Sequence, residues 1–330
     1  MKCTVLGGGS WGTALAVQLT RVGHETVLWD RNPDRCGAIN ATHRNPRYLK
    51  EVTLPGGLRA EHELEAAVEG AELLVPVVPS HALRGVLTRA AGRVRGEALV
   101  CCATKGIEDD TLATMHDVCA QELGTVERVS VLYGPSFALE VAKGLPTAVV
   151  VAGPYEAAHA AAEAFHGDFF RAYHTEDIIG VCVGGSLKNV LAIACGVSDG
   201  LGLGANARAA LITRGLTEMT RLAVAMGADP LTMMGLAGMG DLVLTCTGNL
   251  SRNRRVGLAL GEGRTLDDIL EELGEVAEGV HTAISAHKLA AKMGVDMPIT
   301  QQVYALLHEG KPAQVALMDL MTRERRAEKD

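Results

Sequence analysis

Hydrophobic and polar residues alternate along this chain with two different periods. Up to about residue 175, short apolar runs are separated by segments of helical periodicity, which is typical of β–α–β units with a largely parallel sheet. From about Ile178 onward, apolar residues recur every three or four positions, which predicts helices throughout. We therefore expect an α/β domain over residues 1–177 and an all-helical domain over residues 178–330.

Six apolar runs in the first half are candidate strands. Pro76 lies inside the third run, and because proline cannot donate a ladder hydrogen bond, we expect that strand to be irregular or bulged. The six runs are residues 3–6, 26–29, 73–78, 98–103, 129–132 and 147–151.

The second half predicts a helical bundle whose helices have recognisable boundaries. Thr265 with Asp268 indicates a helix start, and glycines near prolines indicate helix ends. Five further glycines lie in or beside a long apolar helix, where each is costly unless close packing or an exposed backbone requires it. The charged residues 323–330 are expected to form a solvated helix end. The predicted helix ends are Gly274, Gly294 with Pro298, and Gly310 with Pro312. The five glycines stand at positions 185, 196, 200, 202 and 204. One apolar stripe consists of Leu187, Val190, Leu191 and Ala194, and a second of Ile212, Leu216, Met219, Ala223 and Met226.

A glycine-rich turn directly follows the first predicted strand. Gly7, Gly9 and Gly12 fit the spacing GxGxxG, which allows a tight turn, close approach of a pyrophosphate, and close packing of helix on strand. A helix that begins near Ser10 directs its free N–H groups and positive end at the phosphates. The second strand ends in Asp30, about 20 residues further on, where an acidic partner of the ribose is expected. These features predict a Rossmann-type dinucleotide site, and a glycine turn without a ligand is the alternative.

Composition argues against two kinds of partner. The formal net charge of −8 does not suit a general nucleic-acid-binding protein, although it leaves room for a local basic pocket. Aromatic residues make up only 3% of the chain, so base-stacking surfaces are not expected.

We find no apolar run long enough to cross a bilayer, and so expect a globular protein without membrane insertion. A length of 330 residues suits two domains.

Cysteine and histidine usage predicts neither disulfides nor a metal. The eight cysteines form no CxxC pair, and most stand among apolar residues, which predicts buried thiols in a reducing cytoplasm. The eleven histidines form no HExxH or comparable ligand spacing, so we expect no metal site.

Two lysines stand at positions that favour chemistry. Lys105 follows the carboxyl end of a predicted strand, where the cleft of a parallel sheet is expected. Lys188, next to Asn189, interrupts an apolar helix, so it is either a snorkelling surface residue or a partly buried cation with a function. Asp241 follows a glycine-rich turn and could be only a helix cap.

An arginine between two hydrogen-bonding residues is a candidate phosphate clamp. Arg252 stands between Ser251 and Asn253, and a guanidinium with such neighbours suits a phosphate dianion. Other basic side chains are expected to be solvated, namely those of Lys143, Arg254 and Arg255.

These segments resemble those of the bacterial NAD(P)-dependent glycerol-3-phosphate dehydrogenase family. The resemblance spans nearly the whole chain and keeps the order of the family's blocks. It implies reduction of dihydroxyacetone phosphate to sn-glycerol 3-phosphate for glycerophospholipid synthesis, with NAD(H) or NADP(H) as cofactor and without a metal. A homodimer is common among relatives. The matching blocks are residues 7–16, 45–49, 78–84, 102–108, 134–150, 185–215 and 235–257.

The resemblance also implies roles for single residues. Lys188 matches the catalytic lysine, Lys105 a second active-site lysine, and Asp241 an acidic substrate contact. With the motifs above, the expected substrate-binding residues are Lys105, Gly134, Ser136, Lys188, Asn189, Asp241, Thr245, Ser251, Arg252 and Asn253. The expected cofactor-binding residues are Gly7, Gly9, Ser10, Trp11, Gly12, Asp30, Arg31, Tyr48, Lys105, Ala138, Arg252, Val276 and Glu278.

Lys188 would serve as proton donor to the ketone oxygen. Its unperturbed pKa of about 10.4 is too high for efficient transfer near neutrality, so burial and the charge of Lys105 would have to lower that pKa. Asp241 would hold the lysine in place while opposing part of the shift.

Asp30 beside Arg31 departs from the family pattern, in which a small or neutral residue more often precedes the basic one. An acid favours the free ribose hydroxyls of NAD, whereas Arg31 could pair with the 2′-phosphate of NADP. We therefore expect use of both cofactors, with NADPH less favoured than in relatives.

Two other functions share part of these features. One is a reductase or dehydrogenase of another hydroxy acid, which would keep the nucleotide domain, the helical domain and a lysine. The other is a dinucleotide-binding redox sensor without turnover. The blocks around Asp241 and Arg252 argue against the first, and the joint presence of Lys105, Lys188 and Asp241 argues against the second.

Overall fold

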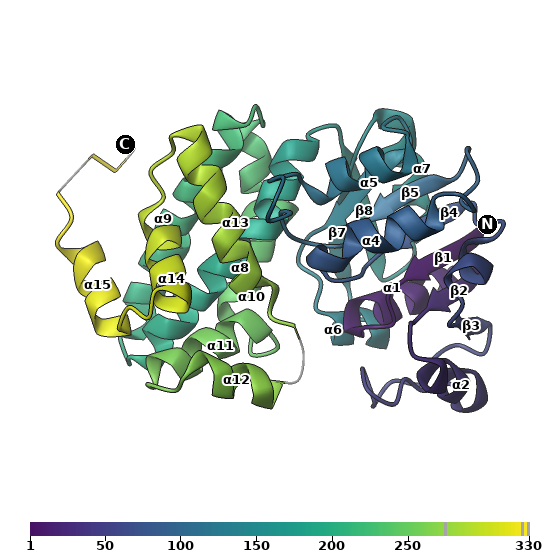
Figure 1. The fold of residues 1–330 in the computed structure, drawn as a ribbon, viewed down its shortest axis with the longest axis horizontal. Coiled ribbons are helices and arrows are strands. Elements are labelled where there is room, and N and C mark those ends of the chain that lie inside the picture. The colour runs from purple at the N-terminus through teal and green to yellow at the C-terminus, as the bar shows by residue number, and fades with distance from the viewer. Residues whose placement is uncertain (274–275, 325–326, 329–330) are drawn as a thin grey trace.

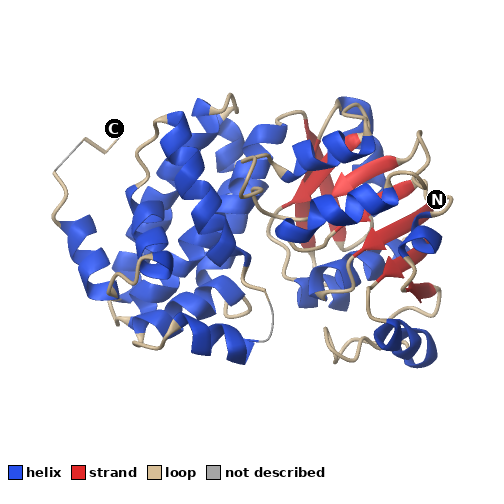
Figure 2. Ribbon diagram, viewed as in Figure 1, coloured by secondary structure: helices blue, strands red, loops and turns tan. Residues whose placement is uncertain are grey.

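The chain folds into a sheet-containing part and a helical part that lie side by side. The computed structural model describes residues 1–273, 276–324 and 327–328. The N-terminus lies in the sheet-containing part and the C-terminus at the far end of the helical part (Figure 1). Strands are confined to the first part, and the described residues from 178 onward contain helices and loops (Figure 2).

The first part is built on one eight-stranded sheet within the described residues, with the order β3-β2-β1-β4-β5-β6-β7-β8. Neighbouring strands run parallel except β6 and β7, which are antiparallel. The strand order reverses beside β1, and a crevice at the carboxyl ends of β1 and β4 is where such sheets bind nucleotides. The strands are β1 Lys2–Leu6, β2 Glu25–Trp29, β3 Leu58–Glu61, β4 Leu73–Pro76, β5 Leu99–Cys102, β6 Val129–Tyr133, β7 Thr147–Ala152 and β8 Phe170–Thr175.

The predicted Rossmann-type fold with a helical second domain is confirmed, with corrections to single strands. β3 and β8, the two strands at the sheet edges, were not predicted, because each buries too few side chains to form an apolar run. The expected bulge at Pro76 is wrong, since β4 pairs in register with β1 up to Pro76 and ends there. At the end of a strand the missing N–H of proline costs little.

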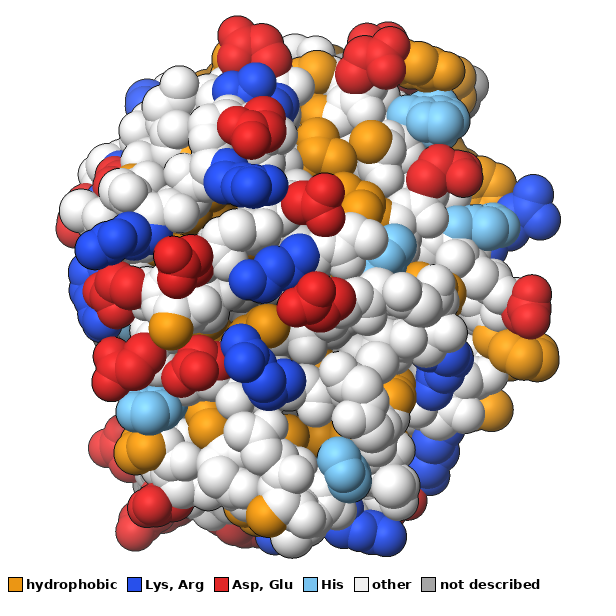
Figure 3. Space-filling view, turned by 90° about the vertical axis from the view of Figure 1, so that its right-hand side faces the viewer, with side chains coloured by type: hydrophobic (Ala, Val, Ile, Leu, Met, Phe, Trp, Pro, Cys, Tyr) orange, Lys and Arg blue, Asp and Glu red, His pale blue; other side chains and the backbone are white. Residues whose placement is uncertain are grey.

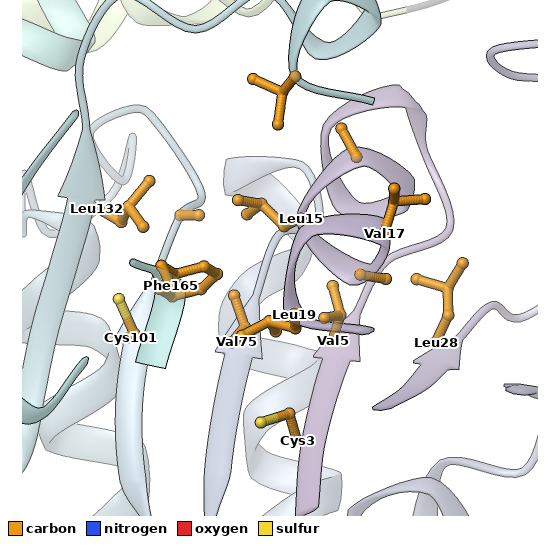
Figure 4. Close-up of a cluster of buried hydrophobic side chains, with 14 of the residues drawn as sticks. Cys3, Val5, Leu15, Val17, Leu19, Leu28, Val75, Cys101, Leu132 and Phe165 are labelled. Carbon is orange, nitrogen blue, oxygen red and sulfur yellow. The ribbon is translucent and has the colours of Figure 1, made fainter. Parts of the chain in front are cut away.

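Helices cover both faces of the sheet, and alternate strand residues enter separate cores. Leu73 and Val75 of β4 belong to one apolar cluster and Leu74 to the other, as the period of two in a strand requires. Figure 4 shows the first cluster, in which Leu15 of α1 and Phe165 of α7 lie over the strands. The helices of this part are α1 Ser10–Arg21, α2 Pro33–Thr42, α3 Leu64–Val68, α4 Ser80–Ala90, α5 Met115–Leu123, α6 Ala138–Lys143 and α7 Tyr155–Phe165.

The helical part is organised around one buried helix, α8 (Ile178–Gly200). Our expectation that no apolar run is long enough to cross a bilayer is wrong, because α8 has that length and composition. However, 83% of its most apolar window is buried inside the protein, which is the environment of a core helix. The other helical elements are α9 Gly204–Ala225, η1 Pro230–Met234, η2 Leu236–Gly240, α10 Asp241–Thr247, α11 Arg252–Gly261, α12 Leu266–Leu273, α13 Glu278–Met293, α14 Pro298–His308 and α15 Ala313–Met321.

Glycines let α8 and α11 touch along their backbones. A Cβ added at Gly196 of α8 would lie 2.1 Å from the carbonyl oxygen of Arg254, and one added at Gly257 of α11 would lie 2.0 Å from that of Ile193. This close backbone contact is the reason that glycine stands at position 196 of α8, although glycine is costly inside a helix. Gly202, in the turn before α9, has a positive φ of 71° that glycine adopts without strain.

Several predicted helix boundaries are present. Thr265 and Asp268 exchange hydrogen bonds at the start of α12, and Gly294 is the left-handed cap that ends α13. Gly310 has a positive φ just after α14. Gly274 and part of the charged tail, residues 325–326 and 329–330, lie outside the described residues.

The cysteines lie inside the protein, and acidic and basic side chains are mixed on the face that Figure 3 shows. All eight cysteines are free and buried, as predicted. Over the end of the sheet-containing part, acidic side chains lie among the basic ones (Figure 3).

Candidate active site

A cavity of about 370 Å³ lies where the two parts of the chain meet. One wall comes from the start of α1, the ends of β4 and β5, and the loop after β6; the other comes from α8, α10, α11 and α13. The structure therefore brings together residues that are far apart in sequence. The predicted site residues among its walls are Ser10, Trp11, Lys105, Ser136, Ala138, Lys188, Asn189, Thr245, Ser251, Arg252, Asn253, Val276 and Glu278.

The glycine turn has the shape that a pyrophosphate needs. Gly7 has a φ of +132°, and a Cβ at Gly12 would lie 1.8 Å from the carbonyl oxygen of Gly7, so α1 packs directly on the turn. A Cβ at Gly9 would meet nothing within 4 Å, which leaves the backbone open to a ligand. The buried Nε1 of Trp11 has no hydrogen-bond partner within the described structure. These residues fit a dinucleotide whose phosphates lie at the start of α1.

Asp30 stands beside this turn but is already paired. It is 4% exposed and accepts a hydrogen bond at Oδ2 from Nη1 of Arg35, at 2.5 Å. Arg35 in turn lies 5.3 Å from the centre of the Tyr48 ring. Arg31 is exposed. Sequence reasoning missed Arg35 as the partner of Asp30.

A buried carboxylate bridges the two predicted lysines. Oδ1 of Asp241 lies 2.5 Å from Nζ of Lys188, and Oδ2 lies 3.2 Å from Nζ of Lys105. Lys188 also donates to Oγ1 of Thr245, at 3.1 Å. Lys188 is 6% and Asp241 1% exposed, so the lysine is a buried cation and does not snorkel. The aspartate side chain does not cap its helix.

The position of Asp241 depends on the segment before it. The π-helical turn η2 packs against α8 so closely that a Cβ at Gly184 would lie 2.5 Å from the carbonyl oxygen of Ala237. α10 begins directly after this turn. Asp241 is thereby placed against the middle of α8, where Lys188 is.

Burial lowers the pKa of Lys188 from 10.5 to about 7. The positive charge of Lys105 lowers it further, whereas the carboxylate of Asp241 opposes the shift. The direction of this pKa shift and its causes agree with the expectation from the sequence. At neutral pH the lysine therefore occurs both with and without its proton, as a general acid and base requires.

The predicted anion clamp lies at the start of α11. Ser251 caps the helix by accepting a hydrogen bond from the backbone N–H of Arg254, at 3.2 Å. Asn253 donates to Oδ1 of Asn189, at 2.9 Å, and accepts from the N–H of Gly279, also at 2.9 Å. Three helices are thus joined around the cavity wall, and Arg252 stands at the positive end of α11.

Comparison with known proteins decides the family. Models of the N-terminus and the C-terminus of NAD-dependent glycerol-3-phosphate dehydrogenase match residues 2–159 and 177–318. This chain belongs to the NAD-dependent glycerol-3-phosphate dehydrogenase family. Membership of this family, which the resemblance of the sequence segments implies, is thereby confirmed.

Similar proteins cover the whole chain. Glycerol-3-phosphate dehydrogenase (NAD(P)+) of Anaeromyxobacter sp. (strain K) is 53% identical over 331 residues, which cover 99% of this chain and 100% of that protein. The crystal structure of glycerol-3-phosphate dehydrogenase from Coxiella burnetii is 46% identical, with a TM-score of 0.94 over 98% of this chain and 99% of that one. The Saccharomyces cerevisiae glycerol-3-phosphate dehydrogenase is 27% identical, with a TM-score of 0.83 and coverage of 98% and 99%.

In this member of the glycerol-3-phosphate dehydrogenase family, the expectation that Arg254 is solvated is wrong. Its Nη2 and Nε lie 2.6 and 2.9 Å from Oδ2 of Asp199, and its side chain is 14% exposed. The pair fastens the start of α11 to the end of α8. Lys143 pairs with Glu51 at the surface, and Arg255 is exposed.

Other predicted residues stand outside the cavity wall. Gly134 lies behind Ser136, whose hydroxyl donates to the Gly134 carbonyl at 2.9 Å. The predicted residues that do not line the cavity are Gly7, Gly9, Gly12, Asp30, Arg31, Tyr48, Gly134 and Asp241. Residues of the wall that sequence reasoning did not assign to the site are Leu49, Val77, Val78, Ala103, Thr104, Phe137, Leu139, Leu250, Arg255 and Leu273.

One contact between the two parts was also missed. The hydroxyl of Ser80, the first residue of α4, donates to Oε2 of Glu278 on α13, at 3.0 Å. Burial raises the pKa of Glu278. No local pattern links two residues separated by 198 positions. Among the described residues, no group of three or more histidine, cysteine or acidic side chains could hold a metal ion.

Proposed function

We propose that this chain reduces dihydroxyacetone phosphate to sn-glycerol 3-phosphate with NADH or NADPH, reversibly, and so supplies the backbone of glycerophospholipids. The observation that carries the proposal is the Lys188–Asp241–Lys105 bridge, because it places two ammonium groups in the cavity that also contains the start of α1 and Arg252. Such a site suits a small anionic ketone beside a dinucleotide.

The bound cofactor would supply a hydride to the carbonyl carbon. Lys188 donates a proton to the carbonyl oxygen, and its lowered pKa makes that transfer efficient near neutrality. Lys105 stabilises the negative charge that develops on the same oxygen. Asp241 holds both ammonium groups at hydrogen-bonding distance and keeps the cluster from carrying two unpaired charges.

The phosphate of the substrate would bind at the start of α11. Arg252 supplies charge, and Ser251 and Asn253 supply hydrogen-bonding groups at the helix N-terminus. Binding the phosphate orients the carbonyl group toward Lys188, so part of that binding energy lowers the barrier.

The chain is proposed to divide into a dinucleotide-binding domain, residues 1–177, and a substrate domain, residues 178–330. This division agrees with the end of β8 at Thr175 and the start of α8 at Ile178. A cytoplasmic location is supported by the eight free, buried cysteines.

Purified protein should oxidise both NADH and NADPH when dihydroxyacetone phosphate is added, measured by nicotinamide absorbance. The acid at Asp30 favours NADH, so we expect NADH to give the higher kcat/KM. Equal or higher efficiency with NADPH would mean that Arg31, and not Asp30, governs cofactor choice. Turnover of a hydroxy or oxo acid in place of the phosphorylated ketone would contradict the proposal, as would cofactor binding without any turnover.

Substitution of Lys188 should affect turnover far more than cofactor binding. Lys188→Ala should lower kcat by on the order of 10² or more, because the proton donor is lost. In the parent enzyme, reduction should slow as the pH rises through about 7, where Lys188 loses its proton, and oxidation should quicken over the same range. Lys143→Ala, at an exposed lysine, is the control. Turnover near the parent level in Lys188→Ala would remove this residue from the mechanism.

Arg252 should decide selectivity for a phosphorylated substrate. In Arg252→Ala, the ratio of kcat/KM for dihydroxyacetone phosphate to that for dihydroxyacetone should fall, because the charge-assisted contact is lost. Arg264→Ala, at an arginine paired with Glu272 on α12, serves as control. An unchanged ratio would place the clamp elsewhere.

The active form is proposed to be a homodimer formed through the helical domain. Its support is the large apolar side chains that this domain leaves exposed, among them Leu231 at 73% and Met234 at 63%. Light scattering on the eluting protein should give twice the chain mass of 34.7 kDa. A mass of one chain at assay concentration would contradict this.

A further inference from the structure

Tyr133, the last residue of β6, is fully buried beside the lysine cluster. Its hydroxyl donates to the carbonyl oxygen of Thr104, at 2.6 Å. Burial raises the pKa of this phenol well above its ordinary value, so it keeps its proton and remains a donor. Thr104 directly precedes Lys105, and the hydrogen bond therefore anchors the backbone from which Lys105 projects.

The ring of Tyr133 also lies near the ammonium group of Lys105. Nζ of Lys105 lies 5.7 Å from the centre of the Tyr133 ring and 6.0 Å from that of Trp11. An ammonium group at this distance is attracted to aromatic rings. Two aromatic side chains and Asp241 thus fix where the charge of Lys105 lies.

The same ring packs on α8. A Cβ added at Gly185 would lie 2.4 Å from Cδ2 of Tyr133, so the absence of a side chain there admits the ring. Gly185 precedes Lys188 by three residues, which is nearly one helical turn. Tyr133 therefore lies between the segment that carries Lys105 and the helix that carries Lys188.

We propose that Tyr133 is a positioning residue that fixes Lys105 relative to Lys188 and so sets how strongly one ammonium group acts on the other. The proposed function matters to this inference only in the kinetic test below, because that test measures the proposed reaction.

The charges around Lys188 make the effect measurable. Lys188 faces Asp241 on α10 and Lys105 from the loop after β5. Cys246 on α10 is a further titratable neighbour, and its raised pKa keeps it neutral. Burial dominates the shift of Lys188, and the charge of Lys105 adds to it. A displaced Lys105 would let the pKa of Lys188 rise.

Tyr133→Phe is the test, because it keeps the ring and removes only the hydroxyl. The pH at which kcat/KM for the reduction falls to half should move upward by on the order of half a unit, and KM for dihydroxyacetone phosphate should increase. The ionisation of the substrate's phosphate is common to all variants and cancels in the comparison.

Ser130→Ala is the matched control. Ser130 lies on the same strand, is 1% exposed, and donates to the carbonyl of Val100 on β5, at 3.1 Å. This variant loses the same kind of buried hydrogen bond without touching the lysine segment. Its thermal stability should fall about as much as that of Tyr133→Phe, while its pH profile stays that of the parent.

A second readout needs no turnover. The pH dependence of acylation at Lys188 by acetic anhydride, followed by mass spectrometry, reports the titration of this amine directly. The midpoint should move upward in Tyr133→Phe and not in Ser130→Ala. An unchanged midpoint in folded Tyr133→Phe, or an equal shift in Ser130→Ala, overturns the proposal. An upward shift in a protein that does not reduce the ketone supports the positioning role and rejects the proposed reaction.

Discussion

The site depends on one buried carboxylate between two ammonium groups. Lys188 and Lys105 come from different parts of the chain, and each contacts one oxygen of Asp241. Removing Asp241 would leave the two ammonium groups buried without a counterion, and loss of one partner of a buried ion pair typically costs about 3–5 kcal/mol. Asp241 therefore holds the two parts together at the point where chemistry is proposed to take place.

The rest of the fold delivers these three groups to one place. The parallel sheet puts Lys105 at the carboxyl end of β5, beside the start of α1. Glycines in α8, η2 and α11 remove the side chains that would keep these segments apart, so that Asp241 and Arg252 both approach the middle of α8. Helix packing this close has no room for even one methyl group.

Burial gives the cluster its chemical character. A lysine in water keeps its proton near neutrality, whereas burial of Lys188 brings its pKa to about 7. The neighbouring charges adjust that value in opposite directions, so small movements of Lys105 or Asp241 change the proton affinity of Lys188. The contacts that place Lys105 and Asp241, including those of Tyr133 with the Lys105 segment, therefore bear on the proton affinity of Lys188.

The sequence alone determined the glycine turn, the central strands, the helical second half and the candidate lysines, because each depends on local spacing or on apolar periodicity. The tertiary structure decided the rest. Edge strands β3 and β8 lack an apolar run, and α8 is read correctly only when its buried surroundings are known. The pairing of Arg254 with Asp199, of Ser80 with Glu278, and of Tyr133 with Thr104 joins residues 29 to 198 positions apart. Such partners are chosen by packing between distant segments, and no local pattern records that choice.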